Sequence, residues 1–183
     1  MSKSTYICLL RGINVGGQKI IKMDQLRESL KTLGLGNVRT YVQSGNVVFR
    51  APKKSAQVLS QRIQETVLSV FGFLVSAVVM SSEELGTTIK SNPFPMEKGI
   101  DVSKLHVTFL SQTPQKSALK ALGALSAEPD QFRYSGKAMY LYCPKGYGRT
   151  KLSNNTLEKV LSVRATTRNW QTVNTLYEMS LEF

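Results

Sequence analysis

The alternation of hydrophobic and polar positions along the chain predicts short strands interleaved with amphipathic helices. In the first half, apolar residues recur at helical spacing behind Asp24 and behind Ser55, and Ser81 and Glu84 have capping-box spacing for a further short helix. Runs of β-branched and aromatic residues predict strands at 5–10, 38–42, 46–49 and 73–80. The resulting order, β-α-β-β-α-β with a trailing helix, is ferredoxin-like: an antiparallel sheet with helices on one face.

The second half repeats this kind of pattern after a break at Asn92-Pro93-Phe94-Pro95. Pro114 is expected at the first position of one helix, and a later helix carries Leu157. Thr167 is expected to cap a last helix, whose apolar face would bury Trp170. Strands are predicted at 104–110, 131–134 and 138–143.

We therefore expect an α+β fold of two small antiparallel-sheet subdomains with helices on one face. The first, residues 1–96, is ferredoxin-like, and the second, residues 97–183, has the order β-α-β-β-α-α and packs against the first. The common β-α-β-β-α core raises the alternative of a structural duplication, although the two halves have negligible sequence similarity.

Composition is that of an ordinary globular protein, with 42% hydrophobic and 20% charged residues. The longest apolar stretch, residues 67–80, is interrupted by Gly72 and is shorter than a membrane span, and the apolar run before Arg11 is too short for a signal peptide. We expect a cytoplasmic protein with no membrane partner.

Cysteine and histidine are scarce, which bears on the chemistry that is available. Cys8 and Cys143 have no CxxC spacing and are expected to be reduced thiols in or beside strands. The single histidine, His106, falls in a predicted buried strand, so no Ser-His-Asp or Cys-His set is evident. No metal site and no cofactor are predicted.

The charge is strongly positive and unevenly distributed. The 24 basic and 12 acidic residues give a net charge of +12. Residues 1–54 carry ten basic and two acidic groups, and residues 131–183 carry eight and three. Such a field attracts polyanions such as nucleic acid or phosphorylated ligands, although solubility alone is the competing explanation.

Three segments have the residue types of an anion site. The loop between the first strand and the first helix combines glycines with cations, although its spacing is neither GxGxxG nor a Walker loop. Its candidate ligand-binding residues are Arg11, Asn14, Gly16, Gly17 and Lys19. The alternative is a loop whose glycines only permit positive φ angles.

The turn at 41–46 supplies Gln43, Ser44 and Asn46, which could bind a ligand, although hairpin turns favour such residues for conformational reasons alone. The stretch at 145–153 is the most suggestive, with Tyr147, Gly148, Arg149 and Lys151 ahead of a predicted helix, and a charged, solvated loop without a ligand is the alternative. Beyond it, Arg164 and Arg168 are further candidate phosphate contacts, or alternatively partners for carboxylates of the other half.

Taken together, five blocks resemble the bacterial domain-of-unknown-function family 1697, from Tyr6 to about Tyr177. They are LRGINVGG at 10–17, YVQSGNVVF at 41–49, NPFP at 92–95, GYGRTKL at 146–152 and ATTRNW at 165–170. The resemblance implies a cytosolic protein of about this length and brings no activity, cofactor or substrate.

The leading functional hypothesis is a binding module for nucleic acid or another phosphate-rich partner. One alternative is an enzyme acting on a phosphorylated small molecule or nucleotide, in a cleft between the halves where Arg11, Arg149 and Lys151 would hold phosphate. The other alternative is an interaction protein that uses an exposed sheet edge.

Overall fold

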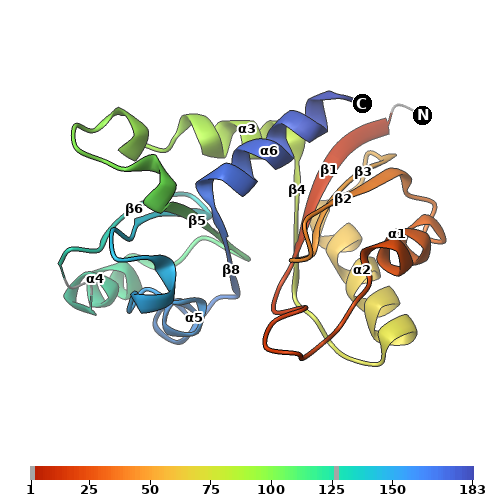
Figure 1. The fold of residues 1–183 in the computed structure, drawn as a ribbon, viewed down its shortest axis with the longest axis horizontal. Helices are drawn as coiled ribbons and strands as arrows, with labels where there is room; N and C mark the ends of the chain where they lie inside the picture. Colours follow the sequence, from red (N-terminus) through yellow and green to blue (C-terminus); the bar gives the residue numbers. More distant parts are fainter. Residues whose placement is uncertain (1–2, 126–127) are drawn as a thin grey trace. The chain divides into compact units, whose positions relative to one another are not determined.

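The chain has an α+β fold with two four-stranded antiparallel sheets (Figure 1), as the sequence predicts. The computed structural model describes residues 3–125 and 128–183. Contacts divide the chain into a first unit, Met1–Gly86 with Thr175–Phe183, and a second unit, Thr87–Asn174. The division by contacts therefore falls at Gly86, whereas the domain boundary after residue 96 stays a prediction.

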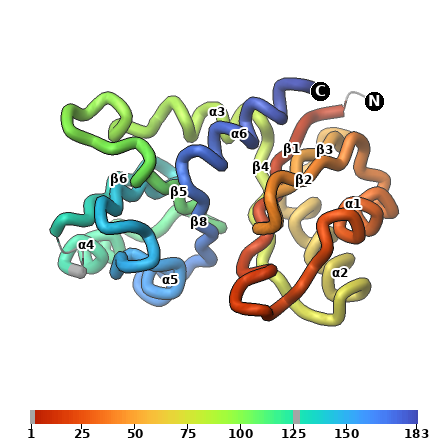
Figure 2. The backbone as a smooth tube through the Cα atoms, viewed as in Figure 1, coloured from red at the N-terminus to blue at the C-terminus, as the bar shows by residue number. Residues whose placement is uncertain are grey.

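The first unit contains one sheet with the strand order β2-β3-β1-β4. Figure 2 traces the backbone through these strands and through helices α1 and α2. Leu9 of β1 is paired with Asn46 of β3, and Leu10 with Ala77 of β4. The elements in chain order are β1 (Lys3–Leu10), α1 (Met23–Lys31), β2 (Gly36–Tyr41), β3 (Asn46–Pro52), α2 (Ala56–Phe71) and β4 (Ala77–Ser81).

Helices α1 and α2 cover one face of this sheet. Alternate residues of β1, among them Tyr6, Cys8 and Leu10, share a buried core with Leu26 of α1 and Ile63 of α2. The other residues of β1 point to the opposite face, because successive strand side chains alternate. The predicted placement of both helices on one face is therefore confirmed for this sheet.

Local signals in the sequence set the helix ends. The Ser55 hydroxyl accepts a hydrogen bond from Val58 N, and Gly72 ends α2 in the left-handed conformation at φ 79°. Ser81 and Glu84 form the predicted capping box: Ser81 N donates to Glu84 Oε2 at 2.7 Å, and Glu84 N donates to Ser81 Oγ at 3.1 Å.

Strand β4 is shorter than predicted and begins at Ala77 rather than at residue 73. Its partner β1 ends at Leu10, opposite Ala77, so the preceding residues have no strand with which to pair. Just before β4, the Ser76 carbonyl accepts from Arg11 N at 2.9 Å.

The second unit contains a sheet with the corresponding strand order, β6-β7-β5-β8. One face carries a core formed by α4 and α5 with residues such as Leu110, Met139 and Ala165. The remaining elements are α3 (Ser82–Lys90), β5 (Leu105–Leu110), α4 (Lys116–Leu125), β6 (Gln131–Ser135), β7 (Ala138–Tyr142), α5 (Asn154–Leu161), β8 (Ala165–Asn169) and α6 (Trp170–Leu181). Short 3-10 helices span Phe94–Met96, Val102–Lys104 and Tyr147–Arg149.

Strand β8 was not predicted, and it corrects the expected order of the second half. Thr167, expected to cap the last helix, lies in mid-strand opposite Thr108 of β5. The cap of α6 is Asn169, whose Oδ1 accepts from Thr172 N at 2.7 Å. Trp170 is half-buried rather than a core residue, and α4 begins at Lys116, beyond the expected proline turn.

The two units therefore repeat one topology, including the hydrogen bonds at the end of the central strand. Leu10 N donates to Gly45 O at 2.8 Å in the first unit, and Leu110 N donates to Lys137 O at 2.8 Å in the second. In each unit, the next residue donates to the carbonyl of the residue just before the edge strand. Arg11 N donates to Ser76 O before β4, and Ser111 N donates to Arg164 O before β8, both at 2.9 Å.

Candidate functional site

The loop between β1 and α1 folds into a small hairpin, which we call the finger (residues 14–19). Asn14 N donates to Lys19 O at 3.2 Å, and Gln18 N donates to Val15 O at 3.0 Å. The two residues at the tip, Gly16 and Gly17, have φ angles of 58° and 73°. A two-residue turn with both central φ angles positive strongly favours glycine, so the turn itself accounts for this pair.

Asn14 joins the finger to the β2–β3 turn. Its Nδ2 donates to Ile21 O at 2.9 Å and to Gln43 O at 2.8 Å, and its Oδ1 accepts from Ile21 N at 2.8 Å. Two segments that the sequence singled out separately are thus brought together. Both amide protons of Asn14 are used by the backbone, so its side chain acts as a clamp.

The β2–β3 turn is organised by Asn46 and Gly45. Asn46 is fully buried, and its Nδ2 donates to Tyr41 O at 3.1 Å and to Ser44 Oγ at 2.9 Å. Gln43 and Ser44 are exposed. The buried amide thus supports the conformational explanation for this turn, in which the side chain satisfies backbone groups.

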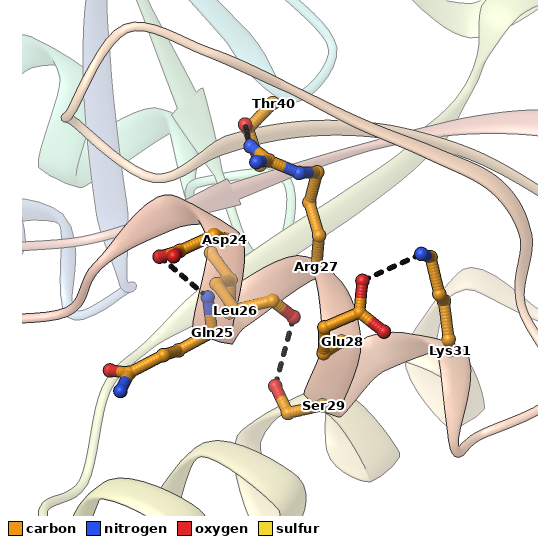
Figure 3. Close-up of polar contacts among 8 residues, drawn as sticks. All are labelled: Asp24, Gln25, Leu26, Arg27, Glu28, Ser29, Lys31 and Thr40. Atoms are coloured by element: carbon orange, nitrogen blue, oxygen red, sulfur yellow. Dashed lines mark hydrogen bonds and ion pairs between the residues drawn. The ribbon is translucent and has the colours of Figure 1, made fainter.

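Polar contacts within the first unit occupy several of its cations. Figure 3 shows Arg27 of α1 reaching β2, where its Nη1 donates to Thr40 Oγ1 at 2.7 Å. On the same helix, Lys31 pairs with Glu28 at 2.7 Å. These side chains attach α1 to the sheet and stabilise its last turn.

Two further cations of the first unit have partners. Lys19 of the finger donates through Nζ to Leu74 O at 2.8 Å. Arg39 of β2 forms an ion pair with Glu182, and its guanidinium lies 5.7 Å from the centre of the Phe183 ring. Much of the positive charge near the N-terminus therefore contributes to internal contacts.

The second unit places Tyr147, Gly148 and Arg149 in a 3-10 turn after β7. Gly146 immediately precedes this turn at φ 92°, a conformation that glycine adopts more readily than other residues. The Tyr147 ring stacks on His106 with the ring centres 4.9 Å apart, and its hydroxyl donates to Thr167 Oγ1 at 3.1 Å. Tyr147 is therefore an anchor that attaches the loop to β5 and β8.

Thr167 is the centre of this anchor. Its hydroxyl donates to Asn154 Oδ1 at 2.7 Å and lies 2.7 Å from Thr108 Oγ1. Since Thr167 has one proton, which goes to Asn154, the Thr108 hydroxyl must donate to it. Burial lowers the pKa of His106 below its usual range, so its ring is neutral at pH 7.

Three cations extend from the anchored loop into solvent: Lys145, Arg149 and Lys151. Within residues 3–125 and 128–183, their side chains have no ion pair or hydrogen-bond partner. The backbone beneath them is held by a bond from Leu152 N to Thr150 Oγ1 at 3.1 Å. The second unit carries thirteen basic and five acidic residues, hence +8, against eleven and seven, hence +4, in the first.

Two other candidate contacts, Arg168 and Arg11, lie outside this loop in the sequence. Arg168 is half-buried on β8, where its Nη1 donates to Thr167 O at 2.9 Å. Arg11 belongs to the first unit, so its convergence with Arg149 and Lys151 stays a prediction.

The sequence did not reveal a hollow of about 360 Å³ in the second unit. It lies where β5 ends and β8 begins, beside the C-terminal end of α5. Its lining residues are Ser111, Gln112, Glu158, Ser162, Val163 and Arg164. Of these residues, only Arg164 was singled out from the sequence, as a candidate phosphate contact. The others come from three separate segments, so the sequence alone did not indicate that they would line one space.

Both cysteines are buried and reduced. Burial raises the pKa of Cys143 to about 11, so this thiol is protonated at pH 7 and is a poor nucleophile. The described part of the chain has no group of three or more His, Cys, Asp or Glu side chains that could hold a metal ion. No helix there is long and apolar enough to cross a membrane.

Comparison with known proteins identifies the family. The solved structure of the conserved bacterial protein SP0830 from Streptococcus pneumoniae shares the fold, with a TM-score of 0.74 and 24% identity over 98% of this chain and 99% of that one. No curated protein matches the chain. The model of the family described as protein of unknown function (DUF1697) matches residues 3–140. The chain therefore belongs to the DUF1697 family.

Proposed function

We propose that this protein binds nucleic acid through the loop at 145–151 of the second unit. The observation that carries the proposal is the set of three exposed cations, Lys145, Arg149 and Lys151, without a partner in the described chain. Like charges held close together repel one another, and an anion that neutralises them removes this repulsion.

The anchoring of the loop supports a binding role. Tyr147 attaches the loop to His106 and Thr167, and Ser153 caps the helix that follows by accepting from Thr156 N at 3.3 Å. A backbone fixed in this way has less conformational entropy to lose when a ligand binds. The cations are therefore presented from a rigid base.

An extended polyanion fits this arrangement better than a small enclosed phosphate. All three cations are exposed, so they can contact the outside of a phosphate chain that stays largely hydrated. Arg149 can also contact two oxygens of one phosphate, or lie over a base. The ring of Tyr147 already stacks on His106, so we assign it no base-stacking role.

The test is the salt dependence of oligonucleotide binding, measured by fluorescence anisotropy with a labelled oligothymidine strand. We expect the wild-type affinity to fall steeply between about 50 and 200 mM salt. The triple variant Lys145→Gln, Arg149→Gln, Lys151→Gln should bind more weakly and have a log–log salt slope shallower by about 2, because three phosphate contacts to a single strand are lost.

The control removes the same charge elsewhere in the second unit, with Lys98→Gln, Lys116→Gln and Lys120→Gln at exposed positions. It should retain most of the salt slope. If both triple variants lost affinity and salt slope equally, net charge rather than the loop would explain binding, which would contradict the proposal. Wild-type binding that is absent, or whose affinity does not change with salt, would also refute it.

A further inference from the structure

Hydrogen bonds join three loops at one end of the first unit's sheet. Asn14 of the finger donates through Nδ2 to Gln43 O of the β2–β3 turn at 2.8 Å. Lys19 of the finger donates through Nζ to Leu74 O, in the loop between α2 and β4, at 2.8 Å. The finger therefore connects the turn at 41–46 to the loop at 72–76.

Each of these loops exposes aliphatic side chains, which we call the apolar tips. They are Val15 at 66%, Ile20 at 59%, Val42 at 52% and Leu74 at 68% exposed. A single exposed apolar residue is ordinary on a protein surface, whereas several on adjoining loops are typical of an interaction site.

Val42 is held in a conformation that valine rarely adopts. Its φ angle is 50°, in the left-handed region, where a β-branched side chain is strained. Asparagine would adopt this conformation at less cost, and the exposed valine gains little from burial, so stability alone does not favour valine here. Strained residues of this kind cluster at functional sites.

The charge around the apolar tips is positive. The segments 11–22, 41–46 and 72–76 contain three basic residues and no acidic residue. Lys22 is exposed and has no side-chain partner among the described residues. Lys19 is bonded to a neutral carbonyl, so its charge is not neutralised. An apolar surface flanked by cations is complementary to an apolar segment flanked by carboxylates.

We propose that the apolar tips bind a segment of another protein in which apolar residues lie beside Asp or Glu. Its apolar side chains would pack on the tips, and its carboxylates would pair with Lys19 and Lys22. Loops that are already joined to one another suit a partner of defined shape, because they lose less conformational entropy on binding.

An anionic membrane surface has the same charge as such a segment but fits the tips less well. None of the four tips is aromatic, whereas Trp and Tyr are the side chains enriched at membrane interfaces. The proposal is also independent of nucleic-acid binding, because the tips belong to the first unit and the loop at 145–151 to the second.

The experiment is selection of a random peptide library, displayed on phage, against the full chain, followed by fluorescence anisotropy with the enriched peptides. We expect these peptides to combine apolar residues with Asp or Glu. The tip variant Val15→Ser, Val42→Ser, Leu74→Ser should bind them at least about tenfold more weakly, because three apolar contacts are lost. If no peptide is enriched, or if the enriched peptides lack acidic residues, the proposal is wrong.

The control removes three exposed apolar side chains elsewhere, with Val58→Ser, Met96→Ser and Val102→Ser. It should bind the peptides as tightly as the wild type does. Equal losses in the control and the tip variant would attribute binding to exposed apolar surface in general and contradict the proposal. Vesicles of phosphatidylcholine and phosphatidylglycerol should not retain the wild type on sedimentation. Retention that the tip variant loses would assign the tips to a membrane instead.

A single substitution separates binding from stability. Val42→Asn should raise the melting temperature, because asparagine adopts a φ angle near 50° with less strain. It should also weaken peptide binding at least about threefold, because an apolar contact is lost. Unchanged affinity in Val42→Asn would overturn the proposal, and a lower melting temperature would contradict the strain on which it rests.

Discussion

Gly45 is held where no other residue fits well. Its φ angle is 74°, and a Cβ built there would lie 2.7 Å from Leu10 Cβ and 2.8 Å from Ile13 Cδ1. Its carbonyl accepts from Leu10 N, so the turn is held against the end of β1. Gly16 also has a positive φ, at 58°, but has open space around its Cα.

These two glycines give a matched pair of substitutions. We expect Gly45→Ala to lower the free energy of unfolding by about 3 kcal/mol, because left-handed strain and a core clash add together. Gly16→Ala should cost about 1 kcal/mol, from the strain alone. Urea denaturation followed by circular dichroism measures both. Equal losses would contradict the close packing of Gly45 against Leu10.

The roles of single polar residues could be predicted only in part. Glycine-rich and asparagine-rich segments favour tight turns, and the structure has such turns at Gly16-Gly17 and at Gly45. Nothing in the sequence indicated that Asn14 would bond to the carbonyl of Gln43, 29 residues away. Such contacts form only between loops that lie at the same end of the sheet. Which loops are neighbours there depends on the strand order, which the local sequence does not show.

At the scale of elements, periodicity and capping predicted most helices and strands, including the Ser81–Glu84 capping box. Strand β8 was missed because its five residues, Ala165–Asn169, precede a helix directly and contain threonines that also serve as helix caps. Its pairing with β5 is a long-range interaction, which local propensity does not register.

Removing the hydroxyl of Thr167 on β8 tests whether this group anchors the loop at 145–151. Thr167→Val keeps the shape but leaves Tyr147, Thr108 and Asn154 without their common partner, so we expect about 2 kcal/mol lower stability. Amide hydrogen exchange should become faster across the loop that carries Tyr147.

The control for this substitution is Thr113→Val, at an exposed position without a side-chain hydrogen bond in the described residues. It should change neither stability nor exchange. If the two valine variants behaved alike, the hydroxyl cluster would not anchor the loop.

At the scale of the whole molecule, the chain consists of two units that repeat one strand order. The charge pattern along the sequence indicated both chain ends as candidate anion sites. Among the described residues, Arg27, Lys31 and Arg39 of the first unit have internal partners, whereas the three cations of the loop at 145–151 do not. Lys22, Lys53 and Lys54 of the first unit are also exposed without a side-chain partner in the described chain, but they do not come from one such loop. The sequence could not show this difference, because the partners come from distant positions.

Nuclear magnetic resonance of the ¹⁵N-labelled full chain, titrated with an oligothymidine strand at low salt, tests whether the loop at 145–151 binds nucleic acid. We predict that the largest amide shift changes occur at Lys145, Arg149 and Lys151 and disappear as salt is added. Shift changes confined to the finger at 14–19, or none at all, would contradict nucleic-acid binding by the second unit's loop.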